Sequence, residues 1–264
     1  MTASSILSVQ WRLVLTLAVL ALSACTSLPA GDASATATPW ERAGLLAGSE
    51  TPVRATGPAD AASLWRHQTF PGKRKNRFQY VWREGRPALA VQSDAAISAM
   101  RQVVMTPSER LDGLRFSWRL AGLIEKADLQ DSSRSDSPLG VVMTFDGDRS
   151  RLSSRDLMLS DLARAVTGED MPYATLMYVW SNDLPVGSVV VSRRTDRIRK
   201  MVIESGAGGL NRWLDYERDV RADFERAFGE APGRLMSVGL MTDTDNTGAS
   251  VRAWYGPVSL RWAR

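Results

Sequence analysis

A short acidic turn near the C-terminus carries residue types that bind sugars. Asp243, Asp245 and Asn246 lie close together in the sequence, and Trp254 follows in the next apolar stretch. Carboxylates and amides hydrogen-bond to hydroxyl groups, and an aromatic ring stacks on the apolar face of a pyranose. We therefore predict that these four residues belong to a glycan-binding site. An interpretation without a ligand stays open, because aromatic residues often fill the core and acidic turn residues often bond only to nearby backbone.

Two further turns could complete such a site. Asp146 and Asp148 follow one predicted strand, and Trp180 and Asn182 stand where another predicted strand ends. Asn182 and the two aspartates add hydrogen-bonding groups, and Trp180 adds an aromatic surface. If these strands end at the same rim as the acidic turn, we expect the three turns to line one concavity.

The same carboxylates could hold a metal ion or perform acid–base chemistry. The acidic turn resembles the start of an EF-hand loop, but Trp254 stands where the bidentate Glu is needed. No metal site or cofactor is therefore predicted, although calcium bound by loop oxygens in another geometry stays open. Paired carboxylates can also hydrolyse glycosidic bonds, one acting as the acid while the other is ionised. The candidate carboxylates are Asp146, Asp148, Asp243, Asp245, Glu204 and Glu217.

The composition excludes several other classes of protein. His67 is the only histidine, so a histidine-rich zinc site is excluded, and no Gly-x-Ser-x-Gly motif supports a serine hydrolase. The glycine-rich stretch at residues 206–209 lacks the third glycine of a dinucleotide-binding fingerprint and has no βαβ context. The net charge of +4 is spread along the chain, whereas nucleic-acid binders concentrate Lys and Arg on one face. We expect no nucleic-acid partner.

Alternating apolar and polar residues predict a protein made mainly of β-strands. Phe78, Tyr80 and Trp82 alternate with polar neighbours, and residues 114–120 alternate most regularly. Further strands are predicted at residues 88–92, 139–145, 173–180, 187–192, 197–204, 235–242 and 250–262. The last two strands flank the acidic turn, which we predict to be the tip of a β-hairpin. Residues 213–220 fit either a strand or a helix.

One clear helix is predicted around residues 153–168. A Ser and an Asp with capping-box spacing mark its start, and a Gly suits its end. The apolar residues that form a single stripe along it are Leu159, Leu162, Ala163 and Val166. A second, short helix is predicted before Gly229, with apolar residues on one side.

Strands at short spacing, with turn residues between them, predict one domain over residues 63–264. The expected fold is a jelly-roll-like two-sheet β-sandwich with one or two helices. At its closing hairpin this fold has a looser likeness to galactose-binding and carbohydrate-binding modules. Residues 25–62 are rich in Ala, Thr, Ser, Gly and Pro, so we expect a flexible tether before the domain.

The first residues predict an exported protein. Arg12 precedes an apolar run over residues 13–22 that is too short to cross a bilayer as a helix. The run closes on Leu22-Ser23-Ala24-Cys25, which resembles a bacterial lipobox. This resemblance implies removal of residues 1–24 and lipidation of Cys25, and several acyl chains give stable membrane attachment. Because Thr26 rather than Asp follows, analogy with lipoprotein sorting favours the outer membrane, facing the periplasm.

Several longer segments also resemble one family. They are Phe70-Pro71-Gly72-Lys73, Phe145-Asp146-Gly147-Asp148 and residues 173–180, 195–200 and 241–247. Together they resemble a bacterial family of exported proteins known as domain of unknown function 3047, over about residues 63–262. The resemblance implies a single domain and carries over no reaction or ligand.

These observations predict an outer-membrane-anchored periplasmic lipoprotein whose β-sandwich binds a glycan or a glycan-like ligand. Two alternatives stay open at this point. One is a carbohydrate-active hydrolase or lyase on the same scaffold. The other is an envelope scaffold protein without a small ligand.

Overall fold

The computed structural model describes residues 65–262, all of which lie within one compact unit. The predicted leader, the lipidation site Cys25 and the predicted tether lie outside the described residues. Within the described part of the chain, no helix is both long enough and apolar enough to cross a membrane.

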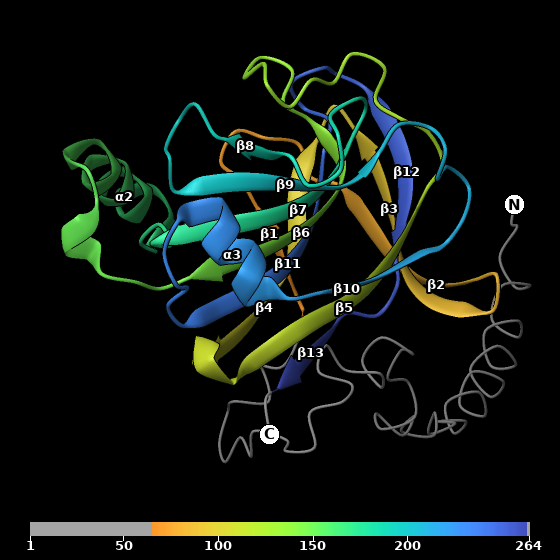
Figure 1. Cartoon of the computed structure of the whole chain (residues 1–264). Helices are drawn as coiled ribbons and strands as arrows, with labels where there is room; N and C mark the ends of the chain where they lie inside the picture. The colour runs from red at the N-terminus through yellow and green to blue at the C-terminus, as the bar shows by residue number, and fades with distance from the viewer. Residues whose placement is uncertain (1–64, 263–264) are drawn as a thin grey trace, which may run out of the picture. The chain divides into compact units, whose positions relative to one another are not determined.

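A seven-stranded sheet forms one layer of the domain (Figure 1). Its strands, in spatial order, are β1 (Arg66–Thr69), β4 (Ile97–Thr106), β11 (Leu235–Asp243), β6 (Ser137–Phe145), β7 (Ala174–Ser181), β9 (Ile198–Ser205) and β8 (Val189–Val191). Neighbouring strands are antiparallel except β7 and β9, which run parallel.

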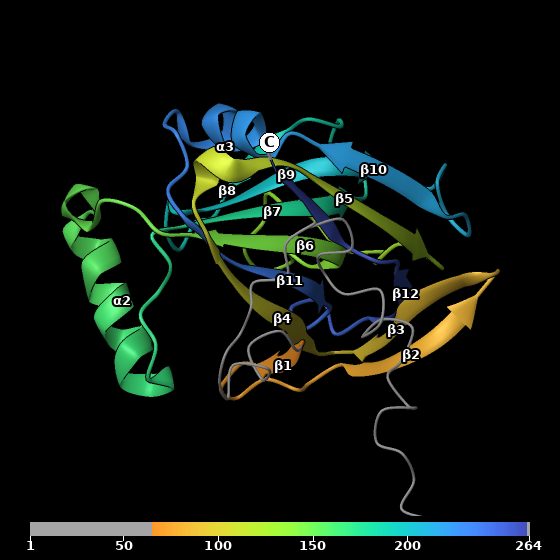
Figure 2. The same ribbon diagram turned by 90° about the horizontal axis from the view of Figure 1, so that it is seen from below.

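A six-stranded antiparallel sheet forms the second layer (Figure 2). Its strands are β10 (Leu214–Arg218), β5 (Leu111–Leu120), β12 (Ser250–Tyr255), β3 (Arg86–Asp94) and β2 (Arg77–Arg83), with β13 (Ser259–Trp262) paired to β5. The apolar faces of both sheets meet in one buried core. The predicted mainly-β, two-sheet sandwich is therefore confirmed.

Aromatic residues fill the space between the sheets. The rings of Trp118 from β5 and Trp180 from β7 lie 6.3 Å apart, and Phe116 stacks on Tyr178 at 5.8 Å. Tyr255 reaches across from β12 to the other sheet, where its hydroxyl donates to the carbonyl of Met241 at 2.6 Å. The regular alternation around residues 114–120 thus arises because every second side chain enters this core.

The acidic turn connects the two sheets, so the prediction of a hairpin is wrong. β11 pairs with β4 and β6, whereas β12 pairs with β3 and β5. β11 and β12 thus lie in opposite sheets, and the apolar face of each strand points into the same core. Thr244 holds the crossing in place, because its hydroxyl lies 2.7 Å from that of Ser93 and accepts the N–H of Ala96 at 3.1 Å.

Two strands were not predicted from the sequence. In β4, Ser98 and Gln102 are buried while Val103 and Met105 are exposed, so the pattern of alternation is lost. All four residues of β1 are exposed, and it pairs only with β4 at the edge of its sheet. The ambiguous stretch at residues 213–220 contains strand β10.

The long helix, α2 (Ser154–Thr167), has the predicted ends. The Ser153 hydroxyl accepts the N–H of Asp156 at 3.1 Å, and Gly168 ends the helix with φ of 80°. Its apolar stripe is not buried, however: Leu162 is 60% and Val166 is 59% exposed. Polar contacts hold the helix instead, including the Arg149 guanidinium that donates to Ser160 at 2.6 Å. α2 lies to one side of the sheets (Figure 2).

The second helix, α3 (Val220–Phe228), covers core residues as predicted. Phe224 is buried, and its ring contacts those of Phe145 at 4.7 Å and Phe228 at 4.4 Å. The Tyr178 hydroxyl donates to Asp223 at 2.7 Å, which ties the helix to β7. Two short 3-10 helices are η2 (Ser108–Arg110) and η3 (Arg149–Arg151).

Candidate functional site

Most charged residues of the six-stranded sheet lie on its outer face, away from the core. Asp215 of β10 stands opposite Ser117 of β5, and Glu217 stands opposite Arg115. Because side chains alternate along a strand, these residues point away from the core that Phe116 and Trp118 fill. We call this surface the arginine face. It comprises Arg83, Arg86, Arg115, Arg119, Arg252, Arg261, Glu84, Asp215, Glu217, Trp213 and Trp254.

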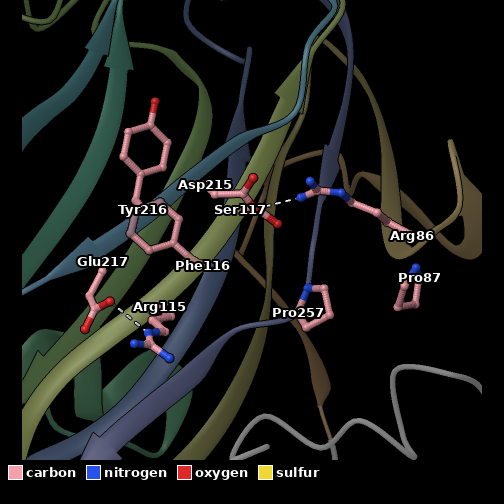
Figure 3. Close-up of a pocket in the computed structure, with 9 residues that line it drawn as sticks. All are labelled: Arg86, Pro87, Arg115, Phe116, Ser117, Asp215, Tyr216, Glu217 and Pro257. Carbon is pink, nitrogen blue, oxygen red and sulfur yellow. Dashed lines mark hydrogen bonds and ion pairs between the residues drawn. The ribbon is translucent and has the colours of Figure 1, made fainter.

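A hollow of about 440 Å³ opens on the arginine face (Figure 3). Its lining residues are Arg86, Pro87, Arg115, Phe116, Ser117, Asp215, Tyr216, Glu217 and Pro257. Figure 3 shows two ion pairs made by residues of β10. Arg86 donates to Asp215 at 2.6 Å, and Arg115 donates to Glu217 at 2.9 Å. The hollow therefore offers both hydrogen-bond donors and acceptors.

These two ion pairs remain accessible to solvent. The side chains are 43% and 63% exposed in the Arg86–Asp215 pair, and 58% and 44% exposed in the Arg115–Glu217 pair. Exposed ion pairs of this kind contribute about 0–1 kcal/mol to stability. A ligand can therefore exchange with either partner at little energetic cost to the fold.

Trp254 lies on the same face between two arginines. The guanidinium of Arg83 is 4.8 Å and that of Arg119 is 5.1 Å from the centre of the indole ring. Arg119 is only 6% exposed, and it donates to Glu84 at 3.0 Å. Its Nε has no hydrogen-bond partner in the described structure. This arrangement fixes a half-buried aromatic ring within a group of cations.

A second tryptophan packs close to the hollow. The guanidinium of Arg86 lies 5.6 Å from the centre of the Trp213 ring. Gly256 lies between Ser117 and Trp213: a Cβ at this position would collide with the Ser117 hydroxyl, while its 3.5 Å distance to the Trp213 ring would be an ordinary contact. Arg86 thus links the second aromatic ring to the hollow.

The acidic turn forms a different and more closed cluster. The carboxylate of Asp136, which is 1% exposed, accepts the N–H groups of Asn246 at 3.1 Å and Thr247 at 2.8 Å. It also accepts the Thr247 hydroxyl at 2.6 Å. Asp136, Asp243 and Asp245 lie together, with carboxylate oxygens within 4.8 Å of one another. Asp136 thus fixes the turn from the start of β6.

Two lysines supply positive charge to this cluster. Lys73 forms an ion pair with Asp245. Lys200 donates to the carbonyl of Ser135 at 2.6 Å, beside the cluster. Burial lowers the pKa of Lys200, whereas the charges of Asp243 and Asp136 act in the opposite direction.

Burial separates the proton affinities of the two turn carboxylates. Burial, followed by the negative charge of Asp136, raises the pKa of Asp243 to about 8. Burial also acts to raise the pKa of Asp245, but hydrogen bonds from Lys73 and Asp243 hold that pKa below its usual value. At neutral pH, Asp243 is therefore the protonated member and donates to Asp245.

This cluster has the residues for two chemistries but engages them internally. Divergent carboxylate pKa values are typical of an acid and base pair, but Asp243 is only 7% exposed and Asp245 is bonded to Lys73. Three carboxylates could also contribute oxygens to calcium, which takes about six to eight. Here Lys73 and Lys200 already supply the positive charge that a cation would bring.

Asp146 and Asp148 do not meet the acidic turn, so the predicted single rim is wrong for them. Asp136 precedes β6 and Asp146 follows it, so the full length of this strand separates them. Asp146 accepts the N–H of Gly147 at 2.9 Å, and Asp148 accepts that of Ser150 at 3.0 Å. Both aspartates thus shape their own loop, and ligand binding by them stays a prediction.

Trp180 and Asn182 lie at the same end of the sheet as the acidic turn, but their side chains are engaged elsewhere. Trp180 is 1% exposed, and its indole N–H donates to the carbonyl of Gly206 at 3.0 Å. The Asn182 amide donates to the carbonyls of Ile124 at 2.7 Å and Ala127 at 3.0 Å. The prediction brought Asp243, Asp245 and Asn246 together correctly, whereas Trp254 lies on the arginine face.

Sequence reasoning missed several residues of both clusters. Asp136, Lys73 and Lys200 come from separate segments, and no spacing rule connects them to the acidic turn. The arginine face had a usable signal, because Arg115 and Arg119 alternate with core residues, as do Asp215 and Glu217. Of these four residues, only Glu217 was among the predicted carboxylate candidates.

Structures of similar fold include proteins that act on or bind carbohydrates. The xyloglucanase domain of NopAA from Sinorhizobium fredii, in complex with cellobiose, matches with a TM-score of 0.41 and 9% identity, covering 75% of this chain and 93% of that chain. The family 30 carbohydrate-binding module of the Clostridium thermocellum cellulase Cel9D-Cel44B matches with a TM-score of 0.36 and 10% identity, covering 75% and 90%. Endoglucanase Cel12A from Rhodothermus marinus matches with a TM-score of 0.38 and 12% identity, covering 75% and 97%. Similarity at this level describes the fold only.

A comparison with curated proteins gave no match. The profile of the family described as "Protein of unknown function (DUF3047)" matches residues 63–259. This match covers most of the chain and confirms the resemblance predicted from the sequence segments. The chain belongs to the DUF3047 family.

Proposed function

We propose that this protein is a lipoprotein of the bacterial outer membrane that binds a glycan in the periplasm. The binding site is the arginine face, and the domain acts as a binding module. The observation that carries this proposal is the hollow of about 440 Å³ on the sheet face that also carries Trp254, because this face combines charged hydrogen-bonding groups with an aromatic ring.

The polar lining of the hollow supports a ligand rich in hydroxyl groups. Arg86 and Arg115 provide several N–H donors, and Asp215 and Glu217 provide acceptors on the same surface. Sugar hydroxyls act both as donors and as acceptors, so they can bond to both kinds of group. The exposure of these side chains leaves them available for such exchange.

The aromatic residues support contact with a sugar ring. Trp254 is held by two arginines, so its orientation costs little conformational entropy when a ligand binds. Trp213 contacts Arg86, which also lines the hollow. Pairs of aromatic rings contribute about 0.5–1.5 kcal/mol beyond the burial of area, and we expect a sugar ring stacked on an indole to contribute on this order.

The cellular location in this proposal rests on the sequence. The short apolar run after Arg12 and the lipobox-like Leu22-Ser23-Ala24-Cys25 support export and lipidation. Metabolic labelling with a fatty acid tests this part independently. Label should be incorporated by the wild-type chain and lost in Cys25→Ala, and label retained in that variant would contradict the lipid anchor.

A glycan array followed by calorimetry tests the binding site. The full chain in detergent should bind at least one glycan, and Trp254→Ala should weaken that binding about tenfold. Trp82→Ala is the matched control. Trp82 is 65% exposed, and because it directly precedes Arg83 on β2, its side chain points to the opposite side of the sheet from the arginine face. Its affinity should equal that of the wild type. Absence of glycan binding, or equal affinity of Trp254→Ala and the wild type, would contradict the proposal.

A further inference from the structure

The cations of the arginine face are all of one kind. The strands of this sheet contain eight arginines and no lysine. A guanidinium is planar and presents paired N–H donors that match the two oxygens of a carboxylate. Arginine greatly outnumbers lysine throughout the chain, so composition alone does not select the ligand, but the planar forks gathered on this face suit a ligand with anionic groups.

The face also has more cations than anions. Its six arginines outnumber the carboxylates available to them, which are Glu84, Asp112, Asp215 and Glu217. Arg252 is exposed and forms no ion pair with any described residue. Glu84 is shared by Arg83 at 3.6 Å and Arg119 at 3.0 Å. The excess positive charge lies on the surface that carries the hollow.

One buried arginine has an unused donor. Arg119 is 6% exposed, yet its Nε has no hydrogen-bond partner in the described structure, and the Nε of Arg83, although 3.6 Å from Glu84, has none either. Leaving a buried donor unpaired is unfavourable, more so for a charged group. An anion that approached the Trp254 edge of the face could draw these guanidinium groups into complete pairs.

The internal carboxylates mark where the anions of a ligand would fit. Asp215 and Glu217 lie two residues apart on β10, about 7 Å along the strand. Asp215 pairs with Arg86, and Glu217 pairs with both Arg115 and Arg261. A ligand with repeated carboxylates could replace them one at a time. In each exchange, the arginine would pair with a carboxylate of the ligand, and the side chain of Asp215 or Glu217 that it replaces would be released to water.

We infer that the ligand of the arginine face is an acidic glycan, a polysaccharide whose sugar rings carry carboxylate groups. This inference rests on the proposed function, since it names the class of glycan for the same site. It makes charge, in addition to ring shape, the basis of specificity. No bond is made or broken in this binding step.

Matched pairs of oligosaccharides test the inference. Suitable pairs are oligogalacturonate with its methyl ester, and oxidised cello-oligosaccharide that carries glucuronate with plain cello-oligosaccharide. For at least one pair, the full chain in detergent should bind the acidic member at least tenfold more tightly. Raising the salt concentration from 50 to 500 mM should weaken that binding severalfold, because screening reduces the attraction between exposed charges.

Arginine variants locate the effect. Arg252→Gln and Arg86→Gln should each weaken binding of the acidic member about fivefold and weaken binding of the neutral member by a smaller factor, because a guanidinium bonds more strongly to a carboxylate than to a hydroxyl. Arg86→Lys should not restore full affinity, because lysine lacks the planar fork. Arg164→Gln is the matched control, since Arg164 is an exposed, ion-paired arginine on α2.

The outcomes separate this inference from the proposed function. Equal or tighter binding of the neutral members would overturn the acidic preference while the glycan-binding proposal stands. Binding of acidic members that is unaffected by both Gln variants would also overturn the inference, because the charge would then be recognised elsewhere. Absence of binding to any glycan would overturn the proposed function and the inference together.

Discussion

The arginine face and the acidic turn use the same residue types in opposite ways. On the arginine face, Asp215 is 63% exposed and pairs with Arg86, which is 43% exposed. In the acidic turn, Asp136 and Asp243 are both buried. The Asp136 carboxylate accepts the backbone N–H groups of Asn246 and Thr247. The difference shows that charged residues near a turn are not by themselves a site. What such residues can bind depends on how many of their hydrogen-bonding atoms already have partners within the protein.

The largest effect is expected at Asp136. Asp136→Ala would leave the N–H groups of Asn246 and Thr247 and the Thr247 hydroxyl without their acceptor. We expect a loss of about 3 kcal/mol in the free energy of unfolding, measured by urea denaturation. Asp136→Asn, which keeps one acceptor, should lose less. A loss below about 1 kcal/mol in Asp136→Ala would mean that the turn is held by other contacts.

A pH series separates the two regions next. Because burial raises the pKa of Asp243 to about 8, its carboxyl group keeps its proton in the folded protein up to a higher pH than in the unfolded chain, where its pKa has the usual value. Stability from this group is therefore complete at acid pH and is lost as the pH rises toward 8. Between pH 5 and pH 7, the wild type should lose about 2–3 kcal/mol more than Asp243→Asn. Parallel curves for the two proteins would contradict the assignment.

A smaller effect is expected on the arginine face. Asp215→Ala makes the same substitution as at Asp136, but it removes an exposed partner from an exposed ion pair. The free energy of unfolding should change by less than about 0.5 kcal/mol. A cost comparable to that of Asp136→Ala would show that this face is part of the folding framework, and that its charges are not free to exchange.

The smallest expected effect is that of calcium on the acidic turn. Lys73 and Lys200 already balance the carboxylates there, so millimolar calcium should leave the melting temperature of the full chain unchanged within about 1 °C. Magnesium serves as the control for ionic strength. A stabilisation of several degrees by calcium alone, reversed by a chelator, would show that the cluster accepts a cation.

Periodic features of the sequence predicted most of the sandwich. Residues 114–120 alternate because one side of β5 enters the core, and the ends of α2 were marked by Ser153 and Gly168. The strand β4 was missed because buried Ser98 and Gln102 reverse its pattern. The supposed hairpin was wrong because strand periodicity says which face is apolar but not which sheet a strand joins.

The candidate site was less predictable than the fold. Local sequence brought Asp243, Asp245 and Asn246 together, but Asp136 and Lys73 reach them only through tertiary structure. Trp254 was predicted as a site residue, whereas its neighbours Arg83 and Arg119 come from other strands. Spacing along the chain could not reveal that Asp146 stands at the far end of β6.

Hydrogen exchange with and without a bound glycan tests the central claim most directly. The full chain would be compared alone and with whichever acidic oligosaccharide binds it most tightly. If the arginine face is the binding surface, amides of residues 111–120, 214–218 and 250–255 should gain protection while those of residues 243–249 stay unchanged. Protection confined to residues 243–249 and the start of β6 would contradict it and assign the ligand to the acidic turn.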